Sequence, residues 1–450
     1  MHESTRSLLD AHLAQAQHDH RVPSMTAALL RDGRLVWSHA AGHLDGRGAG
    51  PRPTAQTAYR IGSISKTFAA ALAMRLVADG LVDLDDPVTD HLPELDPSLR
   101  TVTITALLTH GAGLYAETRG PWWERTAGDD WAALLPSIRR IHPVGRRFHY
   151  SNVGFAVLGE LVARLRERPW WDCLTDEVLT PLGLEHTTYL PPGDAAPGLA
   201  VHPYADLAHA EPAHDAGAMA PAGQLWSTVG DLTAWAHFLA RGNDGVLPDE
   251  LRLAMQVPSL VDDAPGSPWT RAYGLGLDVT NRGGTRLIGH GGSMPGFLAA
   301  LRVEPGSGDG VALLANTTGN LDLDLAIELL DLLQSHEPRA VEEWVTDPAQ
   351  TGDLDVAGAW FWGPRPHVLS LLPGGGVELA PAGSGRGSRF APVGDGSWIG
   401  LDEYYAGEHL VVRDRGGDAA YLDLGSFRFS RTPYDPNAHT PGGTDPSGWH

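Results

Sequence analysis

The sequence predicts an α+β fold followed by a small antiparallel β module, on two observations. Strand-like apolar runs lie near both ends of the first 340 residues, and helix-like segments lie between them. One sheet built from both groups of strands would join distant parts of the chain and be flanked by helices. From residue 358 to 434 the pattern changes to short β-type runs between Gly and Asp turns, which favours a compact antiparallel module.

Local signals predict the elements of the first part in chain order. Residues 4–17 have amphipathic spacing, and apolar runs at 25–30 and 35–41 are joined by an Asp-Gly pair, a strong hairpin signal. Residues 63–78 are rich in Ala, Leu and Met and stop at another Asp-Gly pair, as expected of a helix. Further helices are expected over 103–109, 131–140, 152–167, 231–240 and 321–334, and core strands over 287–303 and 311–316.

The length of the chain predicts more than one domain. Its 450 residues exceed the usual size of a single domain, and its composition changes near residue 345. We expect a domain over 1–340, a β-barrel-like module over 346–436, and a disordered tail over the Pro-, Gly- and His-rich residues 437–450.

Composition and charge exclude several classes of partner and site. A formal charge of −22 disfavours nucleic acid and anionic membrane surfaces as partners. The single cysteine, Cys173, excludes an intrachain disulfide and a cysteine-based zinc site. The first residues do not resemble a secretory leader, and no run of apolar residues is long enough to span a membrane, so a cytoplasmic protein is expected. The oligomeric state stays open.

The only lysine in the chain lies three residues after a serine, at the start of a predicted helix. Of the 33 basic residues 32 are arginine, and the exception is Lys66, in the sequence Ser63-Ile-Ser-Lys66. Residues i and i+3 share one face of a helix. Arginine cannot replace lysine where an amine must lose its proton, and burial lowers the pKa of a lysine. Lys66 could therefore take the proton of Ser63 and activate it as a nucleophile, whereas the alternative is a helix-capping serine beside a surface lysine.

Two further motifs carry groups suited to acyl chemistry. In Tyr150-Ser151-Asn152, an extended backbone would point Tyr150 and Asn152 in the same direction. Tyr150 could exchange a proton with the nucleophile and leaving group, and Asn152 could donate to a substrate carbonyl or to Lys66. His290-Gly291-Gly292 interrupts a strand-like run, where glycines allow a substrate to approach the backbone N–H groups. Each motif alone is also compatible with ordinary packing or a turn.

Taken together in this order, the three motifs resemble the serine β-lactamase and penicillin-recognising family, in its class C β-lactamase, D-aminopeptidase and carboxylesterase branch. The resemblance extends over about residues 10–335, and its flanking segments read YRIGSISKTFAAALAMRLV, VTITALLTHGAGL, FHYSNVGFAVLGELV, PAGQLWSTVGDL and GHGGSMPGF. It implies an antiparallel sheet flanked by helices and packed on a helical subdomain, with the site in the crevice between them.

The resemblance also implies the roles of individual residues. Ser63 would be the acylated nucleophile, and Lys66 and Tyr150 would share the work of general base and general acid. The backbone N–H groups of Ser63 and Ser293 would form the oxyanion hole, and Asn152 would hold the acyl side chain. No cofactor and no metal ion is implied.

One departure from class C β-lactamases bears on the substrate. Where those enzymes have Lys-Thr-Gly, this chain has His290-Gly291-Gly292, and a histidine is mostly neutral near pH 7. We therefore expect a serine hydrolase of small esters, amides or peptides, of the esterase or D-aminopeptidase type. A β-lactamase and an acyltransferase remain alternatives with the same acyl-enzyme, and a catalytically silent scaffold or binding protein is the alternative of another class.

Overall fold

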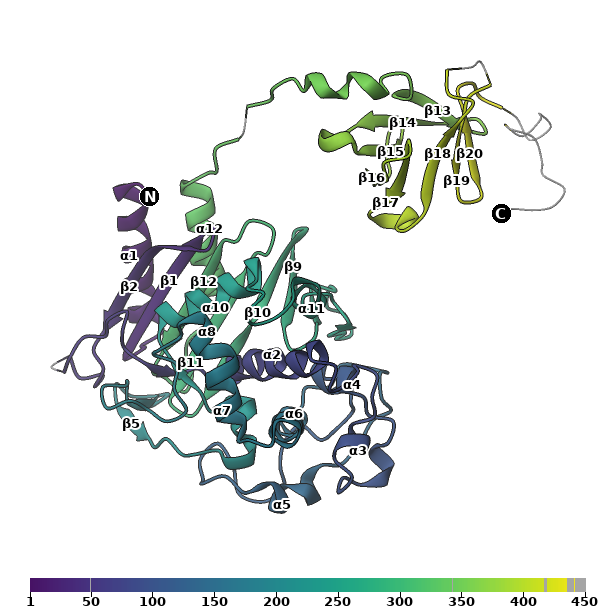
Figure 1. The fold of residues 1–450 in the computed structure, drawn as a ribbon. Coiled ribbons are helices and arrows are strands. Elements are labelled where there is room, and N and C mark those ends of the chain that lie inside the picture. The colour runs from purple at the N-terminus through teal and green to yellow at the C-terminus, as the bar shows by residue number, and fades with distance from the viewer. Residues whose placement is uncertain (49, 342, 417–418, 435–440, 442–450) are drawn as a thin grey trace. The chain divides into compact units, whose positions relative to one another are not determined.

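The computed structural model describes residues 1–48, 50–341, 343–416, 419–434 and 441 (Figure 1). The chain divides into two compact units, Met1–Arg339 and Ala340–His450, which we describe separately. The tail expected over 437–450 lies outside the described residues except at position 441. Within the described part of the chain, no helix is long and apolar enough to cross a membrane.

The first unit is built around an eight-stranded antiparallel sheet in the order β2-β1-β12-β11-β10-β9-β8-β7. Its strands therefore come from two parts of the chain that more than two hundred residues separate, as the sequence predicts. The strands of the sheet are β1 (Ser24–Arg31), β2 (Arg34–Gly42), β7 (Leu260–Val261), β8 (Arg271–Tyr273), β9 (Asp278–Arg282), β10 (Thr285–Met294), β11 (Phe297–Val303) and β12 (Gly310–Ala315). Two short pairs lie outside it, namely β3 (Tyr59–Arg60) with β6 (Trp226–Ser227), and β4 (Gly198–Val201) with β5 (Ala208–Glu211).

The first unit also contains twelve α-helical segments among its described residues. They are α1 (Glu3–Asp19), α2 (Ser65–Ala78), α3 (Val88–His91), α4 (Ile104–Leu108), α5 (Trp131–Leu134), α6 (Asn152–Arg166), α7 (Trp170–Leu174), α8 (Thr180–Leu182), α9 (Ala220–Gly223), α10 (Val229–Arg241), α11 (Asp249–Met255) and α12 (Leu325–His336). Figure 1 shows α2 to α7 gathered below the sheet. Together the antiparallel sheet and the helices that flank it form the α+β architecture that the sequence predicts.

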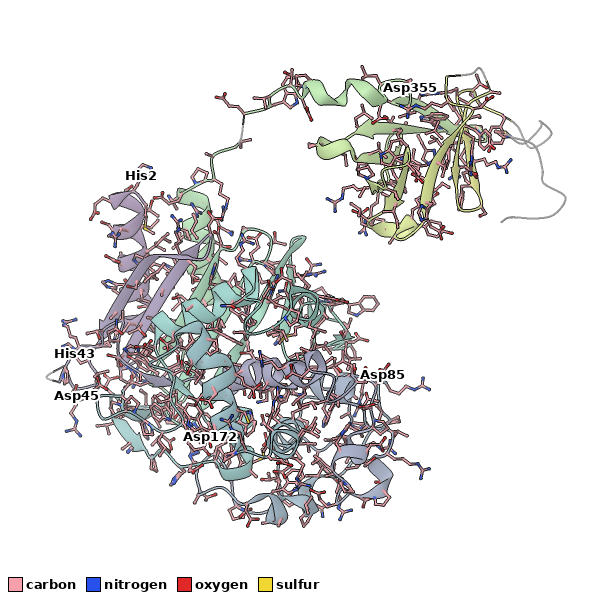
Figure 2. The ribbon with its side chains drawn as sticks, in the orientation of Figure 1. His2, His43, Asp45, Asp85, Asp172 and Asp355 are labelled. Atoms are coloured by element: carbon pink, nitrogen blue, oxygen red, sulfur yellow. The ribbon has the colours of Figure 1, made fainter. Side chains whose placement is uncertain are left out.

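Alternation along the central strands places a hydrophobic layer on each face of the sheet. On β1, Met25 and Leu29 pack with residues of α1 and α12, whereas Ala28 and Leu30 belong to the larger core that contains α2, α6 and α10. Successive side chains of a strand point to opposite faces, so a continuously apolar strand is the pattern of a sheet covered on both sides. Figure 2 shows side chains filling the spaces between these layers.

Three predicted helices differ from those observed. Ser63 lies in a 3₁₀ turn, Gly62–Ile64, and the α-helix begins at Ser65, because the first turn is closed by a tighter i to i+3 bond. The helix predicted over 131–140 ends early, since residues 139 and 140 pair with the segment at 114 and 115. The helix predicted over 321–334 begins at Leu325, because the Asp322 carboxylate accepts the backbone N–H of Asp324 in a competing turn.

The second unit is a closed barrel of eight consecutive antiparallel strands. They are β13 (Gly358–Trp362), β14 (Arg365–Leu371), β15 (Val377–Pro381), β16 (Ser388–Pro392), β17 (Ser397–Gly400), β18 (His409–Arg413), β19 (Tyr421–Leu424) and β20 (Phe427–Ser430). The barrel has its own buried core, which includes Trp360, Phe390 and Trp398. Asp355, labelled in Figure 2, precedes β13 and accepts a 2.7 Å hydrogen bond from Arg415 Nε.

Candidate active site

Ser63 and Lys66 lie within hydrogen-bonding distance at the start of α2. Lys66 Nζ is 2.9 Å from Ser63 Oγ and donates a 2.6 Å bond to the carbonyl oxygen of Ala222, in α9. Lys66 is fully buried, with 0% of its surface exposed, because α2 runs between the sheet and the other helices. The amine is therefore confined to one position beside the hydroxyl.

Burial changes the protonation of both groups that contact Ser63. It lowers the pKa of Lys66 to about 7, and the carboxylates of Glu117 and Glu124 act in the opposite direction. Burial also raises the pKa of Tyr150 above its ordinary value, although a hydrogen bond with Ser63 opposes that rise. At neutral pH a large share of Lys66 is thus an uncharged amine that can accept a proton, while Tyr150 is a phenol.

The segment carrying Tyr150 enters α6 rather than continuing as an extended chain. Asn152 is the first residue of α6, and the Ser151 hydroxyl caps the helix by accepting the backbone N–H of Gly154 at 3.0 Å. Ser151 itself is extended, with φ −138° and ψ 113°, so the predicted extended conformation ends at Ser151 and the predicted helix begins at Asn152. Lys66 Nζ lies 4.9 Å from the centre of the Tyr150 ring, and Tyr150 is hydrogen-bonded to Ser63.

Asn152 makes a contact that the sequence did not predict. Its side-chain N–H donates a 2.7 Å hydrogen bond to Glu117 Oε1, while Trp123 Nε1 donates at 2.8 Å to the other oxygen of the same carboxylate. The Asn152 Oδ1 atom is buried and makes no hydrogen bond to the described residues. The side chain is thus oriented by Glu117, which holds the N–H end and leaves the oxygen for another donor.

Two glycines allow β10 to approach Ser63 closely. A Cβ on Gly62 would lie 2.6 Å from the backbone nitrogen of Ser293, and a Cβ on Gly292 would lie 2.0 Å from the carbonyl oxygen of Ile61. Gly62 also has a φ of +51°, in the left-handed region that favours glycine. The backbone of Ser293 therefore lies directly against the turn that carries Ser63.

His290 is buried beside the same cavity and is neutral. Burial, followed by the nearby charge of Lys66, lowers its pKa to about 3. Its Nδ1 contacts the carbonyl oxygen of Gly291, so the ring proton lies on Nδ1 and Nε2 is an acceptor. His290 therefore supplies no positive charge to the site at neutral pH.

A cavity of about 630 Å³ opens over these residues. Its lining includes six of the predicted site residues: Ser63, Tyr150, His290, Gly291, Gly292 and Ser293. Aromatic and aliphatic side chains complete part of the wall, namely Phe148, Tyr273, Leu323 and Ile327. Lys66 lies beneath this lining against Ser63, and Asn152 is directed towards Glu117.

The cavity also holds five charged side chains that sequence reasoning missed: Asp262, Arg271, Asp278, Arg302 and Asp324. Arg271 and Arg302 each donate a 3.2 Å hydrogen bond to Asp278 Oδ2. Gly289 pairs with Asp278 on one side and with Arg302 on the other, so Arg302 and Asp278 face each other across β10. The cavity thus contains two guanidinium groups and three carboxylates, none of which comes from the position of His290.

Among the described residues, no group of three or more His, Cys, Asp and Glu side chains is arranged to hold a metal ion.

Residues 9–335 match the family model described as Beta-lactamase. The chain belongs to the beta-lactamase family. The resemblance predicted from the three motifs is thereby confirmed, and all the predicted site residues lie inside the matched range. Residues 349–431, which include all eight strands of the barrel, match a domain of unknown function, DUF7586.

Three proteins of known sequence or structure are similar to most of this chain. The chain is 31% identical over 366 residues to penicillin-binding protein 4 of Amycolatopsis lactamdurans, covering 75% of this chain and 92% of the relative. A D-stereospecific amidohydrolase from a Streptomyces species is 28% identical, with a TM-score of 0.59, and covers 73% of this chain and 98% of its own. The octameric penicillin-binding protein homologue from Pyrococcus abyssi shares the fold at 21% identity and a TM-score of 0.63, over 94% of this chain and 99% of its own.

Proposed function

We propose that this beta-lactamase-family protein is a serine hydrolase in which small amides, peptides or esters acylate Ser63. The observation that carries the proposal is the 2.9 Å separation of Lys66 Nζ and Ser63 Oγ in a fully buried setting. A lysine with a pKa of about 7 can take the Ser63 proton as Oγ attacks the substrate carbonyl carbon. The C–N or C–O bond to the leaving group then breaks, and water releases the acyl group in a second step.

The neighbouring groups support the proposed division of roles. Tyr150, a phenol hydrogen-bonded to Ser63, carries a proton between Lys66 and the leaving group. The backbone N–H groups of Ser63 and Ser293 stabilise the oxyanion, a role favoured by the close approach of β10 to the turn at Gly62. His290, Gly291 and Gly292 form the wall against which substrate binds, and Asn152 offers its free oxygen to a donor. The proposed chemistry uses no cofactor.

Amides of D-amino acids and short peptides are the substrates that we propose first. Nearly the whole length of the D-stereospecific amidohydrolase, 98%, is matched by 73% of this chain. The cavity of about 630 Å³ suits a small molecule, and its carboxylates and guanidinium groups suit the charged ends of amino acid derivatives.

Acylation by β-lactams is a second candidate, favoured by one observation. Arg271 lies in the cavity with 59% of its side chain exposed, so its guanidinium group can meet a substrate carboxylate. The penicillin-binding relative from Amycolatopsis lactamdurans is in line with this alternative. Arg271→Ala should weaken acylation by a β-lactam more than acylation by a neutral ester.

Covalent labelling tests the proposal directly. The full chain is treated with a fluorophosphonate, and mass spectrometry locates the adduct. We expect it on Ser63, and its loss in Ser63→Ala. Ser65→Ala is the matched control, because Ser65 is buried and its hydroxyl accepts the Leu225 backbone N–H at 3.1 Å.

A substrate panel then separates the candidates. It contains D- and L-aminoacyl p-nitroanilides, p-nitrophenyl esters and nitrocefin, with and without an amine acceptor to detect acyl transfer. Turnover of the D-aminoacyl substrates in preference to the others supports the first substrate class. An unlabelled protein that turns over none of these compounds would instead support the silent scaffold.

A further inference from the structure

His110 lies directly behind Tyr150 and has no part in the proposed chemistry. The two ring centres are 4.1 Å apart, and the planes are inclined at 33°. His110 is buried, and its ring also contacts Phe155 at 5.1 Å and Tyr273 at 4.5 Å between centres. The imidazole therefore packs against the ring of Tyr150 and restricts its position.

Two hydrogen bonds to His110 hold the residues on either side of Tyr150. The backbone N–H of His149 donates to the His110 carbonyl oxygen at 2.9 Å, and the backbone N–H of Ser151 donates to His110 Nδ1 at 3.0 Å. A backbone N–H can only donate, so Nδ1 is the unprotonated nitrogen and the proton of the neutral ring lies on Nε2. One residue thus fixes the backbone immediately before and after Tyr150.

The backbone conformation of His110 is one that glycine usually adopts. The residue follows α4 with a φ of +56°, and the bonds from His110 N–H to Leu107 O and from Gly111 N–H to Ala106 O are those of a Schellman helix end. Glycine or asparagine is preferred at this position because other side chains are strained there. In this conformation the His110 ring lies beside Tyr150 and its Nδ1 accepts the Ser151 N–H.

We propose that His110, as the neutral Nε2-protonated tautomer, is a positioning residue that directs the Tyr150 hydroxyl at Ser63. This role rests on the proposed function. Burial, with Lys66, His290 and His149 nearby, holds the pKa of His110 well below its ordinary value, so the acceptor at Nδ1 persists at neutral pH. His110 acts through the backbone of residues 149 and 151 and does not itself exchange a proton with substrate.

A matched pair of substitutions separates this role from simple packing. In His110→Asn the side-chain oxygen lies close to the position of Nδ1 and can accept the Ser151 N–H, and asparagine tolerates positive φ. His110→Leu has nearly the same shape as His110→Asn but has no acceptor, and its extra strain at positive φ is measured separately by thermal unfolding of both variants. We expect kcat of His110→Leu for a p-nitrophenyl ester to fall roughly 10- to 100-fold at little changed KM, as for a misplaced catalytic group, and His110→Asn to recover most of the loss.

A double-mutant cycle tests whether the effect passes through Tyr150. In a Tyr150→Phe background, His110→Leu should lower kcat by less than about twofold, since coupled residues are not additive. Equal losses in His110→Leu and His110→Asn, or an undiminished effect of His110→Leu without the Tyr150 hydroxyl, would overturn the proposal. Thermal unfolding of each variant shows whether it is folded.

The tautomer provides a test that needs neither activity nor a stable leucine variant. In ¹⁵N-histidine-labelled wild-type protein, with His110→Asn used to assign the signal, we expect His110 to show a protonated Nε2 and an unprotonated Nδ1 from pH 5.5 to 8. A proton on Nδ1 or a charged ring would overturn the proposal. If wild-type protein shows no esterase activity and no acylation, the proposed function fails, and the tautomer measurement still decides whether His110 holds the Tyr150 segment as described.

Discussion

The Asn152 side-chain N–H donates a 2.7 Å hydrogen bond to Glu117, and the charge of the same carboxylate acts on Lys66. Glu117 lies outside the three sequence motifs, yet it contacts the second of them and influences the first. Its hydrogen bond holds the N–H end of the Asn152 amide, so that Oδ1 is the end without a partner among the described residues. Its charge raises the pKa of Lys66 against the effect of burial. A single carboxylate therefore links the orientation of one proposed substrate-binding group to the protonation of the proposed base.

Replacing Glu117 with glutamine should shift the pH dependence of acylation. The carboxylate raises the pKa of Lys66, so its removal lowers that pKa, and the uncharged amine persists to lower pH. The acidic limb of the wild-type profile is expected near pH 7, and that of Glu117→Gln at lower pH. Presteady-state acylation rates from pH 5 to 9 measure both. A limb that stays in place would show that Glu117 does not act on the titrating group.

Lys66→Arg should slow acylation by at least about 10²-fold, the lower end of what general-base assistance contributes. Arginine keeps the positive charge but does not lose its proton at working pH. Single-turnover labelling measures the rate, and circular dichroism checks the fold because Lys66 is fully buried. If a folded variant keeps more than about a tenth of the wild-type rate, the base is another group, and Tyr150 is the first alternative.

The stability of wild-type protein relative to Lys66→Met should rise as pH increases above 7. The folded-state pKa of Lys66 is about 7 and the ordinary value is 10.5, so between these values the unfolded chain binds more protons. Stability then rises with pH by up to about 1.4 kcal/mol per pH unit. Below pH 7 the difference should be constant, since Lys66 is protonated in both states. Urea unfolding of both proteins from pH 6 to 9.5 measures it, and a difference independent of pH would contradict the lowered pKa.

Gly292→Ala should destabilise the protein by about 1–3 kcal/mol and impair acylation. Its Cβ would lie 2.0 Å from the Ile61 carbonyl oxygen, and β10 would have to move away from the turn that carries Ser63. Gly291→Ala is the matched control for stability, since its Cβ would meet only Leu323 Cδ1 at 3.6 Å, an ordinary contact. Thermal unfolding should separate the two variants, and the labelling rate is compared between Gly292→Ala and wild type. Similar behaviour of both would show that close approach of β10 is not required.

A chain that ends at Arg339 should fold and still be labelled at Ser63. The first unit, Met1–Arg339, has its own hydrophobic layers on both faces of the sheet, and every proposed site residue lies within it. Labelling and melting of the shortened protein test the proposed domain organisation. A folded but unlabelled product would mean that the barrel contributes to the site.

The sequence predicts correctly those helices and strands whose ends depend on residues nearby in the chain. The α+β fold class and the family could be predicted in this way, because apolar periodicity and motif order are local properties. Boundaries that depend on a partner were missed. The helix predicted over 131–140 is short because residues 139 and 140 pair with the distant segment at 114 and 115.

At the candidate site, the spacing of Ser63 and Lys66, and the fact that Lys66 is the only lysine, are properties of the sequence alone. The tertiary structure decided the protonation of that lysine, since the depth of burial depends on the helices and sheet packed around α2. It also decided the contacts of Glu117 with Asn152, of Arg302 with Asp278 across Gly289, and of His110 with the Tyr150 segment. These residues are distant in sequence, and only strand register and helix packing bring their polar atoms within hydrogen-bonding distance.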